Sequence, residues 1–132
     1  MTSGITFNDH LLTRLEYRRD WSHSPVFPRG PATRAEAVLL NYNFKHGVSS
    51  AGRAEYISGT GNATNGAVNL LYGPGSGAWS ITVIPTFQDH GFFVRGDFSF
   101  VQVTHYTPGD GFGPNGMNRN QPRGMIETGF MF

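Results

Sequence analysis

The sequence predicts an all-β protein, built as an antiparallel up-and-down meander of about six or seven strands. Gly accounts for 18 of its 132 residues and Phe for 11, whereas charged residues make up only 14%, against about 25% in ordinary soluble domains. Runs rich in aromatic and β-branched side chains are separated by turn-rich stretches. Within these runs, apolar and polar residues alternate with the period of two that is typical of strands.

The same composition excludes several other classes of protein. Aromatic residues reach 14% and the net charge is only +1, which argues against intrinsic disorder and against a nucleic-acid partner. The absence of cysteine excludes a disulfide framework and a thiolate metal site. No apolar run approaches the ~20 residues that a membrane-spanning helix needs.

Six runs are predicted as strands, and a fragment of an earlier strand ends at residues 5–7. Their lengths fit the roughly 9–11 residues of a transmembrane β-strand. In chain order, the six predicted strands are 10–21, 35–45, 49–58, 78–88, 92–103 and 123–132.

The first two runs also carry helix signals. Asn8 and Asp9 precede a group of leucines, and Thr33 with Glu36 forms a capping box before an apolar run. Because strand alternation holds in six consecutive segments, it outweighs these two local signals. Pro85 falls inside a predicted strand, where it requires a bulge or a position near the strand end.

Alternation by itself fits two architectures. A soluble sandwich turns the apolar face inward, whereas a membrane barrel turns it toward lipid and the polar face toward a lumen. Long and short loops alternate here, as they do in outer-membrane barrels. The predicted long loops are 22–33, 59–77 and 104–122, and the short ones are 45–48 and 89–91.

Aromatic and charged residues also favour the barrel. Aromatic side chains such as Trp21, Phe44 and Trp79 stand near strand ends on the apolar face, which is typical of interfacial girdles. Charges within the strands lie almost wholly on the polar face. The exceptions, Arg19 and Glu36, adjoin a long loop, so they are expected at the rim of the barrel.

The polar face carries recurring pairs of opposite charge two residues apart, a spacing that places both groups on one side of a strand. In a water-filled barrel such pairs would form a charged wall that sorts solutes; on a solvated sheet they would be weak surface pairs. The residues predicted to line a pore are Arg14, Glu16, Arg18, Asp20, Arg53, Glu55, Arg95, Asp97, Arg123 and Glu127.

The chain ends on a terminal Phe132, preceded at alternating positions by Phe130 and Ile126. This pattern resembles the outer-membrane β-signal, in which the last strand is recognised by strand pairing and aromatic pockets. We therefore expect these three residues to direct assembly by the barrel-assembly machinery.

Several stretches resemble the closing strands of the putative beta-barrel porin-2 family (OmpL-like outer-membrane porins). They are Leu15-Glu-Tyr-Arg-Arg-Asp20, Arg53-Ala-Glu-Tyr-Ile57, Trp79-Ser-Ile-Thr-Val-Ile-Pro-Thr-Phe-Gln88 and Phe93-Val-Arg-Gly-Asp97. The resemblance extends from about residue 9 to residue 132. Family members are longer and carry a signal peptide, which the start of this chain lacks. Residues 1–132 are therefore expected to be the C-terminal portion of such a barrel.

The resemblance implies a bacterial outer-membrane location, contact with lipid and the barrel-assembly machinery, and passive diffusion of small hydrophilic solutes or ions. It leaves monomer and homo-oligomer both open. The alternative function is a soluble all-β module that binds a ligand or carbohydrate. No enzyme is expected, since no Ser–His pair has fitting parity. The five histidines are scattered without ligand spacing, so neither a metal nor a cofactor is expected.

Overall fold

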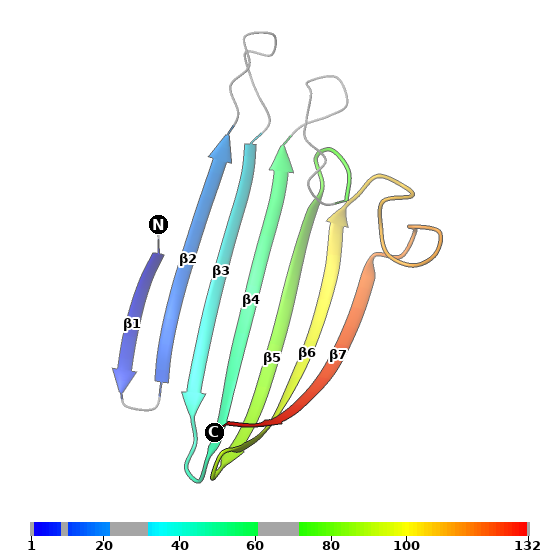
Figure 1. Cartoon of the computed structure of the whole chain (residues 1–132). Helices are drawn as coiled ribbons and strands as arrows, with labels where there is room; N and C mark the ends of the chain where they lie inside the picture. Colours follow the sequence, from blue (N-terminus) through cyan, green and yellow to red (C-terminus); the bar gives the residue numbers. More distant parts are fainter. Residues whose placement is uncertain (1, 9–10, 22–31, 61–71, 132) are drawn as a thin grey trace.

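The computed structural model describes residues 2–8, 11–21, 32–60 and 72–131. They form one seven-stranded antiparallel sheet in which the strands follow one another in chain order (Figure 1). The predicted all-β meander is thereby confirmed. The strands are β1 (Thr2–Asn8), β2 (Leu11–Trp21), β3 (Ala32–Asn43), β4 (Val48–Thr60), β5 (Gly77–Asp89), β6 (Phe92–His105) and β7 (Asn120–Phe130).

The sheet is not closed, because β1 pairs only with β2 and β7 pairs only with β6. All the described strands belong to this one sheet, so the sandwich that alternation also allowed is wrong. The two helix signals are also overridden, because residues 11–21 and 33–36 lie in β2 and β3. No helix in the described part of the chain is long and apolar enough to cross a membrane.

Some strand limits differ from the prediction. β3 begins at Ala32 instead of residue 35, which brings Arg34 into the strand, and it ends at Asn43. β7 begins at Asn120, although Pro122 had suggested a loop up to that point. Edge strands tolerate proline on their unpaired side, and that tolerance explains the difference.

Two tight turns connect β3 to β4 and β5 to β6. Each has two consecutive residues with positive φ, His46 with Gly47 (63° and 73°) and His90 with Gly91 (43° and 87°). Positive φ at both central positions is the signature of the turn whose twist matches a β-hairpin. The Gln88 amide donates to the Gly47 carbonyl over 2.8 Å. We call this end of the sheet the short-turn end, and the opposite end the loop end.

Pro85 lies inside β5, which ends at Asp89, and no bulge occurs at Pro85, so the bulge that the sequence offered as one of two options is absent. The β5–β6 register continues in phase across it, but pairing is interrupted opposite Gly96 and Asp97. Hydrogen bonds from Gly59 to Ser76 and from Gln88 to Gly47 show that even-numbered residues of β5 bond to β4. A backbone amide at position 85 would therefore point to β6. Because proline has no amide, the β5–β6 ladder has a local gap at this position.

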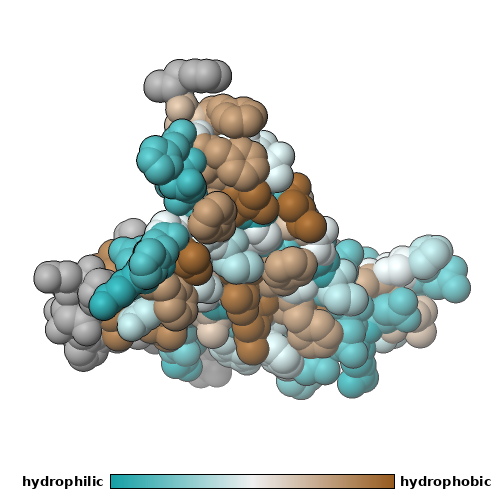
Figure 2. Space-filling view, turned by 90° about the horizontal axis from the view of Figure 1, so that it is seen from below, coloured by the Kyte–Doolittle hydropathy of each residue, from teal (hydrophilic) through white to brown (hydrophobic). Residues whose placement is uncertain are grey.

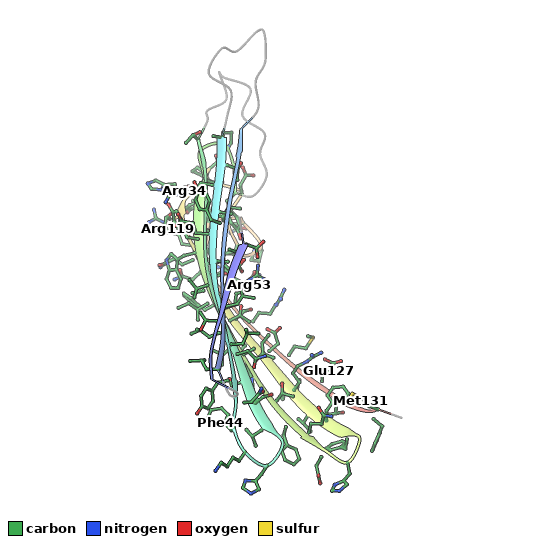
Figure 3. All side chains as sticks on the ribbon, turned by 90° about the vertical axis from the view of Figure 1, so that its left-hand side faces the viewer. Arg34, Phe44, Arg53, Arg119, Glu127 and Met131 are labelled. Atoms are coloured by element: carbon green, nitrogen blue, oxygen red, sulfur yellow. The ribbon has the colours of Figure 1, made fainter. Side chains whose placement is uncertain are left out.

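The sheet is curved, and its short-turn end sweeps to one side (Figure 3). Arg53, Glu127 and Met131 point to this side, whereas Arg34 and Phe44 point to the other. We call the first side the concave face and the second the convex face. Seen from the short-turn end, hydrophobic side chains run through the middle of the molecule and hydrophilic ones lie toward its flanks (Figure 2).

A single layer leaves both faces open. Large apolar side chains of the convex face are about half exposed, as with Leu40 (47%), Ile81 (48%) and Phe98 (51%). Among the described residues, the only buried hydrophobic side chains are Ala78 and Val103. The convex face therefore lacks the cover that an apolar surface of a soluble protein would need.

Candidate pore-lining face

The register aligns the predicted charges of β2 and β4 in two adjacent rows. Arg14 pairs with Leu39, and Leu39 with Arg53, so the two arginines share one row. Glu16 and Glu55 are linked in the same way through Ala37. The register thus places the two glutamate positions one step nearer the loop end than the two arginine positions, and all four positions have the strand parity of the concave face.

Two ion pairs lie on this face among the described side chains. Arg53 pairs with Glu55 along β4, and the Ser80 hydroxyl on β5 donates to the second Glu55 oxygen over 3.1 Å. Arg95 on β6 pairs with Glu127 on β7, with 3.1 Å between its Nε and a carboxylate oxygen. The first pair connects two strands through Ser80, and the second connects two strands directly.

The register gives all ten predicted residues the same strand parity, that of the concave face. Asp97 lies opposite Met125 and Arg123 opposite Ser99, so neither has an opposite charge as its direct partner across the β6–β7 ladder. The side chains of Arg14, Arg18 and Asp20 lie outside the described residues. That the ten residues line a pore stays a prediction.

The convex face has an amphipathic row near the loop end. Tyr17, Glu36, Tyr56, Trp79 and Gln102 are successive partners across β2 to β6. The indole N–H of Trp79 donates to the Gln102 side-chain oxygen over 2.9 Å. Aromatic rings with a polar group are the side chains that collect at a membrane–water interface.

A second group of aromatic residues stands at the short-turn end of the convex face. The rings of Tyr42 and Phe44 are 4.7 Å apart, and those of Phe92 and Phe130 are 5.3 Å apart. On β5, Trp79 and Phe87 mark the two levels and are eight residues apart. At ~3.3 Å per residue and a tilt of ~40°, this spans roughly 20 Å, close to the ~25 Å apolar band of outer-membrane barrels.

Arg34 is a convex-face charge that the sequence prediction missed. It pairs with Glu36, with 2.9 Å between its Nε and the carboxylate, and its guanidinium lies 6.0 Å from the centre of the Tyr17 ring. The signal was present in the sequence, since Arg34 and Glu36 have the same two-residue spacing as the concave pairs. It was lost because the strand was predicted to start at residue 35.

The predicted assembly residues lie at the free edge of the sheet. Ile126 and Phe130 belong to the convex face and are 71% and 69% exposed; Phe132 is outside the described residues. Hydrogen bonds from Val103 to Arg119 and from Met131 to Gly91 show that odd-numbered residues of β7 bond to β6. The even-numbered residues therefore direct their backbone groups to the open edge.

Two loop segments are bonded to each other at the loop end. The Thr107 amide donates to the Tyr72 carbonyl over 2.9 Å, and the rings of Tyr72 and Phe112 are 5.2 Å apart in an edge-on arrangement. Tyr72 also lines a cavity of about 360 Å³ whose other walls include Arg53, Glu55 and Ser80. Sequence reasoning did not find Tyr72, because it stands in a loop without any periodic pattern.

The described residues hold no group of three or more His, Asp or Glu side chains that could bind a metal ion. The candidate site is therefore a wall of side chains with no metal centre among the described residues. Its chemistry is that of paired charges, hydroxyls and the Tyr72 ring, which can bind and orient a solute.

Residues 32–132 match the model of a protein family described as putative beta-barrel porin-2, OmpL-like. The chain belongs to this family. The match begins where β3 begins, so it includes both ion pairs of the concave face. The family is one of porins and not of enzymes. Searches among curated proteins and among solved structures gave no match.

Proposed function

We propose that this chain forms part of the wall of a bacterial outer-membrane β-barrel, through which small hydrophilic solutes or ions diffuse passively. One observation carries the proposal: the sheet has a charged concave face and an exposed apolar convex face bounded by aromatic residues at both ends. Lipid outside and water inside is the environment that gives both faces favourable contacts.

The balance of charge supports passage of solutes with little selection by sign. The ten predicted pore-lining residues comprise five arginines and five carboxylates, so a wall built from them has no net charge. Opposite charges fixed on one wall produce a local field without an overall preference for cations or anions. Small hydrophilic solutes are therefore the class that this wall fits best.

The topology supports the proposal that residues 1–132 are the C-terminal portion of a larger barrel. With seven strands in meander order, β1 and β7 run in the same direction, so they cannot pair with each other in an antiparallel way. Bacterial single-chain barrels have an even number of antiparallel strands and at least eight. A barrel that contains these seven strands thus needs an odd number of further strands.

The partners follow from the same proposal. Lipid covers the convex face, and the barrel-assembly machinery recognises β7 through its open edge and its convex residues Ile126 and Phe130, together with the terminal Phe132. A monomer of the complete barrel and a homo-oligomer both fit this arrangement.

The proposal is tested by refolding the protein from denaturant into detergent and into lipid vesicles. We expect a β-rich spectrum in detergent and flotation with the vesicles. Stepwise conductance in planar bilayers is expected of the complete barrel that contains these seven strands, because the seven strands alone do not close. A monodisperse monomer that unfolds cooperatively in buffer without detergent would contradict the proposal, because an exposed apolar face cannot persist in water as a folded monomer.

A further inference from the structure

The loop end of the concave face carries a preformed cover. Ala78 and Val103 are opposite each other in the register and only 4% and 1% exposed, in contrast to the rest of this open sheet. Both belong to the concave face. Tyr72 lines the cavity on that same face together with Ala78, so its loop covers the sheet there.

The cover is held by contacts within and between the two loop segments, residues 72–76 and 106–119. In the first, the Ser76 amide donates to the Gly73 carbonyl over 3.2 Å, and the Ser76 side chain is buried. In the second, Phe112 and Asn118 form a β-bridge, and the Tyr106 hydroxyl donates to the Met117 carbonyl over 2.9 Å. Figure 1 shows the two segments side by side at the loop ends of β5 and β6.

A close contact joins the two segments at Gly73. A Cβ atom added there would lie 2.1 Å from the Thr107 side-chain oxygen, so only glycine permits this approach. The φ angle of Gly73 is +100°, a value that side chains rarely adopt. The cover is therefore a built structure that depends on one glycine contact, the Tyr72–Phe112 ring pair and the Thr107–Tyr72 hydrogen bond.

Beneath the cover, the cavity brings the Tyr72 ring together with the paired charges of Arg53 and Glu55. Its volume of about 360 Å³ lies at the low end of the roughly 300–1,000 Å³ of small-molecule sites. Glu55 is already bonded to Arg53 and Ser80, whereas Glu16 forms no ion pair among the described side chains. Burial raises the pKa of Tyr72, so its hydroxyl keeps its proton and can donate a hydrogen bond.

We propose that this covered cavity is a binding subsite for small uncharged polyhydroxylated solutes of monosaccharide size. The Tyr72 ring offers an apolar surface for the C–H face of such a solute, and the paired Arg53 and Glu55 offer hydrogen bonds without net charge. Glu16 disfavours an anion of the same size. This inference rests on the proposed function, because the subsite lies on the concave face along which solutes are proposed to diffuse.

The test uses saturation-transfer NMR on the detergent-solubilised protein, with glucose and gluconate as probes of similar size. We expect transfer to glucose that exceeds transfer to gluconate. Tyr72→Ala should lose most of the glucose signal, whereas Tyr72→Phe, which keeps the ring, should keep most of it. Equal signals for Tyr72→Ala and the unmodified protein, or gluconate equal to glucose, would overturn the inference.

Two glycine variants form a matched pair for the cover itself. Gly73→Ala places a Cβ against Thr107, whereas Gly109→Ala, at a similar φ of +98°, meets nothing within 4 Å. Both positions have a φ that side chains rarely adopt, but only the first change places a Cβ against the other segment. We expect Gly73→Ala to weaken glucose transfer several-fold and Gly109→Ala to retain it; equal effects would show that the cover does not shape the subsite.

Failure of the subsite and failure of the porin proposal give different results in the NMR and conductance measurements. NMR binding needs no conductance, so a complete barrel that binds glucose but does not conduct would retain the subsite and contradict the porin proposal. A protein that conducts but gives the same NMR signals in Tyr72→Ala would retain the porin proposal and lose the subsite.

Discussion

Arg95 on β6 and Glu127 on β7 face each other across the last strand pair, and their side chains form an ion pair on the concave face. The two residues are 32 positions apart in the sequence and belong to the last ladder before the open edge. Both side chains are about half exposed (49% and 44%). A pair of this exposure contributes little to stability, about 0–1 kcal/mol, so its main effect is on the charge of the face.

We predict that Arg95→Ala changes ion selectivity and leaves insertion nearly unaffected. Removal of the guanidinium leaves Glu127 uncompensated, so the wall should favour cations more than before. The measurement is the reversal potential of the complete barrel that contains these strands, across a planar bilayer under a salt gradient, together with the fraction of protein that refolds into vesicles.

Glu127→Gln is the matched control for Arg95→Ala. It removes the opposite charge from the same pair, so the reversal potential should shift the other way, toward anions. A shift of the same sign in both variants, or none in either, would show that this face does not border the conducting path.

Two neighbouring residues on β5 test which face meets lipid. Val83 lies on the convex face midway between the levels of Trp79 and Phe87, and Thr82 lies on the concave face opposite Arg53. We predict that Val83→Arg destabilises the protein in vesicles by about 2–4 kcal/mol, the cost of an arginine at the bilayer midplane. Thr82→Arg should cost much less, because its side chain stays in water.

The measurement is the free energy of unfolding by urea from lipid vesicles, for both variants and the unmodified protein. The difference in unfolding free energy between the two variants tells which face meets lipid, because each variant introduces the same side chain, one residue apart on the same strand. If Thr82→Arg proves the more damaging change, the assignment of the two faces is reversed.

The tight turn between β3 and β4 gives a prediction about glycine. Gly47 has a φ of +73°, and a Cβ there would lie 2.0 Å from the Gln88 carbonyl oxygen. We predict that Gly47→Ala slows or prevents hairpin formation and lowers stability by well over 1 kcal/mol. Refolding kinetics into detergent, followed by circular dichroism, measure the effect.

Gly52 is the control for Gly47, because it lies within β4 and a Cβ there would meet nothing within 4 Å. Gly52→Ala should be neutral or stabilising by about 0.4–1 kcal/mol, since alanine restricts the unfolded chain. A strong loss of stability in Gly52→Ala would mean that another group packs against this part of the convex face.

Alternation was sufficient to predict the two faces of the sheet and the parity of the charged residues. It works because side-chain direction depends only on position along a strand. Register was not predictable, since any in-phase shift preserves the same faces; that Arg95 opposes Glu127 emerged only from the structure. Arg34 was missed because strand limits depend on pairing with the neighbouring strand.

The loop cover was beyond sequence reasoning for a different reason. Tyr72 and Phe112 are 40 positions apart, and both stand in glycine-rich segments without periodicity. Their contact depends on the path of two loops, which is determined by positive-φ glycines such as Gly73 and by a few long-range hydrogen bonds. Local pattern contains no information on which loops meet.

The open edge of β7 gives the last prediction. Its even-numbered residues direct their backbone groups away from β6, but Pro122 has no amide to offer. The part of the edge that can pair fully is therefore 124–130, which contains Ile126 and Phe130. We predict that deletion of Phe132, or Phe130→Ser, reduces assembly into the outer membrane several-fold, because both remove aromatic contacts beside this pairing segment.

Met131→Ser is the control, since it changes an apolar side chain between these two positions but on the concave side of the strand (Figure 3). Assembly is measured as the fraction of protein that reaches the cell surface in folded form, compared with total protein. We expect the control to assemble normally, because its side chain points away from the convex aromatic residues. If deletion of Phe132 leaves surface delivery unchanged, the terminal strand does not act as an assembly signal. If Met131→Ser is equally harmful, recognition depends on overall hydrophobicity at the C-terminus and not on one face of β7.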